Sequence, residues 1–213
     1  MTTSTGLLAA HALACRRGRR LLFSGLELQL QPGAVTWLRG TNGSGKTSLM
    51  RILAGLSKPA AGQVSWGGQA MREASEPARL IYIGHANALK DDLTLAEAVA
   101  FLATLSGLDR ATERARAALD QMDLASRREA PVRTLSQGQR RRGALARLVL
   151  DEQPRTWILD EPFDALDSAS VALLVRVIEA NARRHGAVLL TSHQPIDIAG
   201  ALEFDLEPWR AAA

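Results

Sequence analysis

A glycine-rich loop between two patterned segments constrains this chain more than any other feature. The apolar run at 34–38 predicts a buried strand, and the pattern at 48–54 predicts a helix that ends at Gly55. Between them lie Gly40, Thr41, Asn42, Gly43, Ser44, Gly45, Lys46 and Thr47, and Ser48 follows. The three glycines allow the backbone to wrap around an anion, with N–H groups pointing inward at the positive end of a helix. This order of strand, loop and helix predicts a phosphate-binding loop.

Two side chains at the end of this loop predict a nucleoside triphosphate bound with Mg²⁺. Lys46 supplies a positive charge for the β and γ phosphates, and the hydroxyl of Thr47 is a suitable Mg²⁺ ligand. The alternative is a glycine-rich turn with a chance lysine. The strand and helix patterns on either side of the loop argue against that alternative.

A pair of carboxylates follows a second apolar run, at 157–159. Asp160 is predicted to hold Mg²⁺ through water, and Glu161, one residue further, to act as the general base for an attacking water. The alternative is a solvated turn made by Asp160, Glu161 and Pro162. The uncharged run that leads directly into the pair favours the end of a buried strand.

The segment Leu135-Ser136-Gln137-Gly138-Gln139 carries a capping box, in which Ser136 and Gln139 predict the start of a helix that continues through 143–150. Taken alone it is explained equally well as an ordinary helix cap. Lying between the phosphate loop and the carboxylate pair, it resembles the signature of the ABC-type ATPases, with Gln137 where that family most often has glycine. The resemblance covers about residues 7–206.

The resemblance implies the fold and its subdivisions. We expect an α/β P-loop NTPase with a RecA-like core sheet and flanking helices, an antiparallel β-subdomain and an inserted helical subdomain. Residues 1–213 would form a single ABC-type ATP-binding domain, with the helical subdomain at about 86–147. The cofactors implied are ATP and Mg²⁺.

Further site residues follow from the same resemblance. Ser136, Gly138 and Gln139 would bind the γ-phosphate of an ATP held by the loop of a second ATPase domain, which makes a homodimer the expected form. Asp167 matches the segment that crosses the dimer interface in the family. His193, after the apolar run at 187–190, matches the histidine that contacts the γ-phosphate and holds the attacking water together with Glu161.

Two positions depart from the family pattern. Arg17 stands where many relatives have an aromatic residue that stacks on adenine; adenine could stack on its guanidinium, or Arg17 could be solvated and apolar contacts alone hold the base. His85 replaces the usual glutamine that touches Mg²⁺ and the catalytic water. Because imidazole titrates near neutral pH, we expect hydrolysis to be unusually sensitive to pH.

Composition fits a compact intracellular ATPase. The chain has 213 residues, enough for one domain, and a single cysteine, Cys15, which excludes an intrachain disulfide. No apolar run approaches the roughly 20 residues that span a bilayer. A net charge of +4 without a basic stripe argues against direct binding of nucleic acid. The run Arg140–Arg142 is interpreted as a solvated helix face, although it could instead steer nucleotide or touch acidic lipid headgroups.

Local patterns predict the remaining elements. The segment at 6–15 is expected to be the first strand, and 62–68 an edge strand with its turn. Thr94 and Glu97 form another capping box ahead of a helix at 98–105, which Gly107 closes. A last helix is expected from about Ser168 to Arg184.

The expected function is that of an ATP-hydrolysing motor. The family's DNA machines and translation factors need insertions or duplications that are absent here, so we expect permease subunits as partners and a peripheral position on the cytoplasmic face of the inner membrane. The segment at 19–26, His85 and the Thr191–Pro195 ending are similar to the ATP-binding subunits of bacterial cytochrome c maturation. That resemblance implies haem delivery in c-type cytochrome biogenesis. The alternatives are the ATPase of a different transporter, or a soluble regulatory ABC ATPase acting on a protein or nucleic-acid partner.

Overall fold

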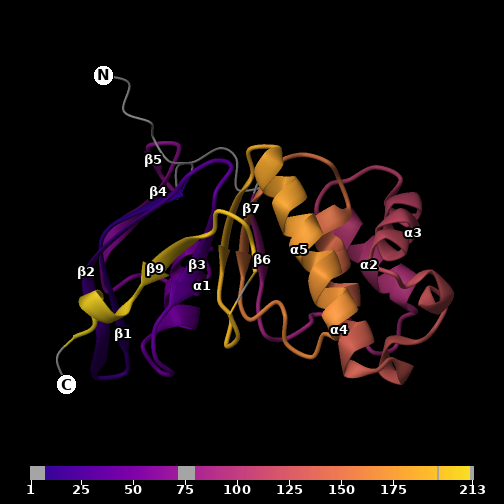
Figure 1. Ribbon diagram of the computed structural model, residues 1–213, viewed down its shortest axis with the longest axis horizontal. Helices are drawn as coiled ribbons and strands as arrows, with labels where there is room; N and C mark the ends of the chain where they lie inside the picture. The colour runs from indigo at the N-terminus through magenta and orange to yellow at the C-terminus, as the bar shows by residue number, and fades with distance from the viewer. Residues whose placement is uncertain (1–7, 72–79, 196, 212–213) are drawn as a thin grey trace. The chain divides into compact units, whose positions relative to one another are not determined.

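The computed structural model describes residues 8–71, 80–195 and 197–211 (Figure 1). They group into two compact units. The first comprises the described parts of 1–82, 154–160 and 179–213, and the second comprises 83–153 and 161–178. Residues 86–147, expected to form a helical subdomain, fall inside the second unit; their assignment to one undivided domain stays a prediction.

A five-stranded sheet forms the base of the first unit. Its strand order is β6 (Leu80–Ile83), β7 (Thr156–Leu159), β8 (Ala187–Leu190), β3 (Val35–Arg39) and β9 (Leu202–Asp205). β3 pairs in parallel with β8 and β9, and β7 pairs in parallel with β8. Every residue of β7 and β8 is buried, as expected for apolar strands covered on both faces. The strands predicted around 34–38, 157–159 and 187–190 are confirmed.

A four-stranded antiparallel sheet completes the β structure of the first unit. Its order is β2 (Arg20–Leu30), β1 (Leu8–Arg17), β4 (Ala61–Trp66) and β5 (Gln69–Ala70). The prediction that 62–68 is an edge strand was wrong, because the short β5 turns back and pairs with Ser65 and Trp66. The first strand lies where the sequence predicted, from Leu8; Gly6 and Leu7 are outside the described residues. Together the two sheets confirm the predicted α/β fold with an antiparallel β part.

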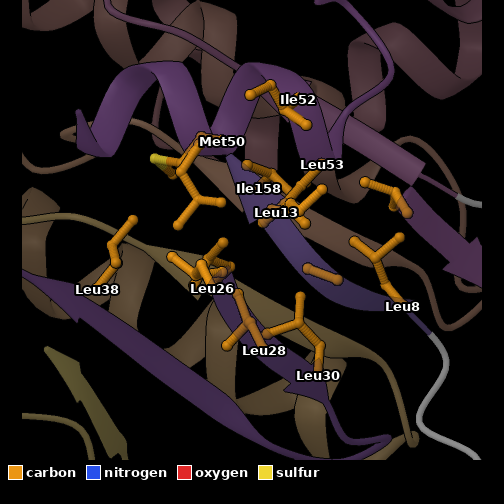
Figure 2. Packing of buried hydrophobic residues seen from close by; sticks show 14 of the residues in the cluster. Leu8, Leu13, Leu26, Leu28, Leu30, Leu38, Met50, Ile52, Leu53 and Ile158 are labelled. Carbon is orange, nitrogen blue, oxygen red and sulfur yellow. The ribbon is translucent and has the colours of Figure 1, made fainter. Parts of the chain in front are cut away.

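The core of the first unit joins both sheets to the helix that follows the phosphate loop. That helix, α1 (Lys46–Leu53), buries Leu49, Met50, Ile52 and Leu53. They meet leucines of β1 and β2 and Ile158 of β7 (Figure 2). Burying a leucine or isoleucine side chain contributes about 1.5–3 kcal/mol, so this cluster fixes α1, and with it the loop, on the sheets.

The second unit is helical. It contains α2 (Leu95–Leu105), α3 (Ala111–Gln121), α4 (Gln137–Leu145) and the first part of α5 (Ser168–Arg183). Both predicted capping boxes are present, at Thr94 and at Ser136. α2 and α4 approach closely at Gly143, where an added Cβ would lie 2.7 Å from a methyl of Leu95.

The helix expected to continue through residue 150 is shorter in its α-helical part. α4 ends at Leu145, and the chain continues as a 3-10 helix over Ala146–Val149. Tightening of this kind is common where a helix ends, because it satisfies the last carbonyl groups. The last predicted helix is confirmed within one residue.

Candidate nucleotide site

The phosphate loop has the backbone that its glycines predicted. Gly40, Gly43 and Gly45 all have positive φ angles, at 145°, 78° and 108°. A Cβ at Gly40 would lie 2.8 Å from Ser44 Oγ, and one at Gly45 would lie 3.2 Å from the Phe23 ring. α1 begins directly after Gly45, with no side chain capping its N-terminus. Its first N–H groups therefore have no side-chain partner at the cap, which is the arrangement found at anion sites.

Two side chains of the loop fit an anion held there. The Lys46 ammonium donates to the carbonyl oxygens of Gly40, at 2.7 Å, and Thr41, at 3.3 Å, so it lies over the loop. Ser44 is buried, and among the described residues its hydroxyl has no hydrogen-bond partner. Orphaned buried hydroxyls are uncommon, so a phosphate oxygen would satisfy Ser44 in the position where the sequence predicts one. Thr47 is exposed, whereas the hydroxyl of Ser48 forms a hydrogen bond with the buried Cys15 thiol.

A second set of contacts, which sequence reasoning missed, fixes the start of the loop. The Thr41 N–H donates to Glu207 Oε1 at 2.6 Å, and Arg210 donates to the Thr41 hydroxyl at 3.1 Å and to Glu207 at 2.8 Å. The hydrogen bond from Arg210, followed by those from Thr41, lowers the pKa of Glu207 to about 2. No local motif signals this contact, because 166 positions separate Thr41 and Glu207 in the sequence.

A cavity of about 590 Å³ adjoins the loop beside these residues. Arg20, Leu22, Gly43, Glu207 and Arg210 are among the residues that line it. Arg17 is exposed at the end of β1, paired with Arg20 across the hairpin. Its predicted contact with adenine stays a prediction.

Asp160 follows β7 in the first unit and is buried. Its carboxylate accepts a hydrogen bond from the hydroxyl of Thr191, at 3.1 Å, so the ends of β7 and β8 are joined beside it. Burial, and then the negative charge of Asp160, raise the pKa of Tyr82. His193 is exposed two residues beyond Thr191. The parallel order of β7 and β8 thus places Asp160 and the segment of His193 at the same sheet edge.

Glu161 belongs to the second unit and has an unusual backbone. It is buried and has a φ of 49°, in the left-handed region that residues with a Cβ rarely occupy. Arg141 donates to the carbonyl oxygen of Glu161 at 2.7 Å and to that of Pro162 at 3.3 Å. Left-handed backbone at non-glycine residues concentrates at functional sites.

The interpretation of Arg140–Arg142 as a solvated face was wrong for Arg141, which is only 3% exposed, and for Arg142, whose side chain is 16% exposed. Consecutive helical residues point about 100° apart, so three arginines cannot share one face. This helical spacing is the feature of the sequence from which the burial of part of the run could have been predicted. The cost of burying the two charges is offset by hydrogen bonds to carbonyl oxygens.

The signature segment and the segment around Asp167 meet within the second unit. Ser136 and Gln139 complete their capping box, with distances of 3.2 and 3.0 Å. A Cβ on Gly138 would lie 2.8 Å from the carbonyl oxygen of Ala165, so glycine is required there. Asp167 caps α5 by accepting from the N–H of Ser170 at 2.8 Å, and hydrogen bonds from Ser170 lower the pKa of Asp167.

His85 lies at the surface of the second unit. Its side chain is 82% exposed, and Nδ1 lies 3.8 Å from a carboxylate oxygen of Asp164. The residue before it, Gly84, accepts a hydrogen bond from Arg141 at 2.9 Å. Arg141 therefore links the backbone of the residue before His85 to the backbone of Glu161.

A family model described as ABC transporter matches residues 23–164, which include the loop, the signature and the carboxylate pair. The chain belongs to the ABC transporter family. The resemblance of the signature segment is thereby confirmed, and with it the classification of the chain as an ABC ATPase.

Individual relatives of this ABC ATPase agree with that membership. It is 45% identical over 93% of its length to a protein of Aromatoleum aromaticum named cytochrome c biogenesis ATP-binding export protein CcmA, covering 94% of that protein. A protein of the same name from Dechloromonas aromatica is 44% identical, with 90% and 95% covered. A solved dimeric structure of the ATP-binding cassette MJ0796, bound to ADP and Pi, shares the fold, with a TM-score of 0.77, 20% identity and 88% of each chain covered.

No helix in the described parts of the ABC ATPase is both long enough and apolar enough to cross a bilayer. The roles of its individual site residues stay predictions, and they divide between the units. The loop, Asp160 and His193 belong to the first unit, whereas His85, Ser136 and Glu161 belong to the second.

Proposed function

We propose that the chain is the ATP-hydrolysing motor subunit of a membrane complex that delivers haem in c-type cytochrome biogenesis. The observation that carries this proposal is the 45% identity to a cytochrome c biogenesis export protein, which extends over 93% of the chain and 94% of the relative. Similarity over nearly the whole length, rather than over the phosphate loop alone, favours a shared role over the role of an unrelated ABC ATPase.

The first unit would bind the nucleotide. Backbone N–H groups of the loop and the Lys46 ammonium hold the β and γ phosphates, and the buried hydroxyl of Ser44 donates to a phosphate oxygen. Thr47 and Asp160 would hold Mg²⁺, Asp160 through water, and His85 would be a further ligand of the ion or of its water. Mg²⁺ supplies positive charge that neutralises the phosphate oxygens.

Hydrolysis would then depend on Glu161. Its carboxylate accepts a proton as the water oxygen bonds to the γ-phosphorus, and the bond from that phosphorus to the β–γ bridging oxygen breaks, which gives ADP and inorganic phosphate. His193 orients the water and contacts the γ-phosphate. Ser136, Gly138, Gln139 and Asp167 of a second copy complete the site, an arrangement supported by the dimeric state of the solved cassette with the same fold.

The partners proposed are permease subunits, with the chain held peripherally on the cytoplasmic face of the inner membrane. The relatives' name, export protein, supports an association of this kind. ATP-driven closure of the dimer would be transmitted to the membrane subunits, and the residues of this chain would not touch haem.

The proposal is tested by trapping the complex. Tagged Glu161→Gln protein, produced in native membranes with ATP, keeps the nucleotide bound because the base is lost, so the closed complex is purified with its partners. The expected result is co-purification of haem-handling membrane proteins together with a Soret absorbance band. A different permease without haem would contradict the pathway, and recovery without any membrane protein would contradict the motor role. Tagged Lys46→Ala is the matched control, since it should not trap nucleotide.

A further inference from the structure

Arg141 makes an unusual set of contacts for a residue of the signature helix. It is 3% exposed and lies five positions after Ser136 on α4. Its guanidinium donates to two separate segments of the second unit. The acceptors are the carbonyl oxygens of Glu161 (2.7 Å), Pro162 (3.3 Å) and Gly84 (2.9 Å) and the side-chain oxygen of Asn87 (3.3 Å).

These contacts bear directly on the backbone of Glu161. Two of the acceptors are consecutive carbonyl oxygens, so the guanidinium holds the two successive peptide units that follow Glu161, one on each side of Pro162. A left-handed backbone at a residue with a side chain costs about 1–3 kcal/mol and persists only when its surroundings hold it. Glu161 has this backbone, with φ at 49°. The Asp164 N–H, which donates to the same Glu161 oxygen at 3.3 Å, closes the turn.

We infer that Arg141 is a positioning residue that fixes the backbone of Glu161 and ties it to the segment that carries His85. The inference rests on the proposed role of Glu161 as the general base. Because Arg141 and the signature residues share α4, a displacement of the signature helix would also displace Glu161. The two are joined by a rigid fork of hydrogen bonds, not by a flexible contact.

Of the arginine, lysine and glutamine side chains, only that of arginine can donate to all of these acceptors at once. A planar guanidinium has five N–H donors in a fixed plane and can serve three carbonyl groups at once. Lysine keeps the charge but acts as a point donor on a flexible stem, so it would satisfy only part of the set. Glutamine is shorter and brings two donors, so it would leave buried carbonyl groups unpaired, each at a cost of about 1–3 kcal/mol.

The experiment compares Arg141→Gln and Arg141→Lys with Arg142→Gln. Arg142 is the matched control, because it lies next on the same helix and also donates to backbone carbonyl groups, but those belong to Met122 and Asp123. kcat and KM for ATP are measured on the full chain in native membranes. We expect kcat to fall between about 10-fold and 100-fold in Arg141→Gln, because small misplacement of a catalytic group has effects of this size. Arg141→Lys should be intermediate, KM should change less than about threefold, and Arg142→Gln should keep kcat within about threefold.

A second measurement reports on position without requiring hydrolysis. Amide hydrogen exchange at 161–166 should accelerate in the Arg141 variants and stay at the wild-type rate in Arg142→Gln. Should Arg141→Gln fail to fold, Arg141→Lys and Asn87→Ala carry the test, since Asn87→Ala removes one acceptor of the guanidinium without touching Glu161.

Either of two results would overturn the inference. One is wild-type kcat and exchange in both Arg141 variants; the other is a parallel loss of kcat and melting temperature in the Arg141 and Arg142 variants, which a purely structural role predicts. The proposed base is judged separately. If Glu161→Gln hydrolysed ATP at the wild-type rate, that role would be wrong, while the exchange data would still decide whether Arg141 holds the turn.

Discussion

The phosphate loop of the first unit and the Glu161 turn of the second unit are held in different ways. Glycine backbone, Lys46 and an exposed contact fix the loop; the side chains of Glu207 and Arg210 are 33% and 35% exposed. The turn relies on Arg141, which is 3% exposed. Exposed ion pairs contribute little to stability, whereas removing the donor of buried carbonyl groups leaves them unpaired. Replacing Glu207 or Arg210 should therefore perturb the loop only slightly, whereas replacing Arg141 should perturb the Glu161 turn strongly.

The largest expected effect separates binding from hydrolysis. Glu161→Gln should lower kcat by between about 100-fold and 10,000-fold and leave ATP affinity within about threefold, because only the proton acceptor is lost. Lys46→Ala should lose both, because its charge holds the phosphates. Steady-state ATPase assays and nucleotide titration measure the two quantities. Equal loss of affinity in both variants would contradict the separate roles of the two regions.

The next effect is a steric one beside the turn. Gly138→Ala places a Cβ 2.8 Å from the carbonyl oxygen of Ala165, so α4 or the following segment must move. Overpacking of this kind costs typically about 1–3 kcal/mol of unfolding free energy. Denaturant unfolding measures it, with Gln137→Ala, at the exposed neighbouring position, as the control. An unchanged midpoint would contradict this prediction, because it would show that the added Cβ is accommodated without loss of unfolding free energy.

A smaller effect is expected at the loop. Glu207→Gln should weaken ATP binding only a few-fold, because glycine backbone and Lys46 still shape the loop. The pKa of Glu207 is about 2 in the folded chain, below the ordinary value of 4.5. The contribution of this carboxylate to stability is therefore present above pH 4.5 and is lost as the pH falls toward 2. The difference in unfolding free energy between wild type and Glu207→Gln should shrink over this range, and a constant difference would refute the contact.

The smallest effect concerns the pH profile. His85→Gln should change kcat at the optimum less than about threefold but should flatten the rate profile near neutral pH, since glutamine does not titrate. A profile unchanged by His85→Gln would contradict the prediction of unusual pH sensitivity.

The local parts of this structure could be predicted from the sequence. Apolar runs identified β3, β7 and β8 because strands buried on both faces carry no alternation, and side-chain caps identified the starts of α2 and α4. The glycines of the loop predicted its positive φ angles. In each case a few neighbouring residues determine the conformation.

The non-local parts could not be predicted in the same way. The burial of Arg141 depends on carbonyl groups supplied by two other segments, and the Glu207 contact joins positions 166 residues apart. The pairing of β5 with β4 involves two residues and leaves no periodic pattern. The left-handed backbone of Glu161 has no signature in its residue type, because glutamate seldom adopts it.

The position of β3 in its sheet has a consequence for folding. β3 carries the phosphate loop, yet Val35 pairs with Val188 of β8, and Thr36 pairs with Leu202 of β9. Both partners are distant in the sequence, whereas α2 and α3 of the second unit follow one another along the chain and pack together. High separation of contacting residues slows folding, so the strand that supports nucleotide binding should be among the last to acquire its neighbours. ATP binding, followed during refolding, should then appear later than helical signal.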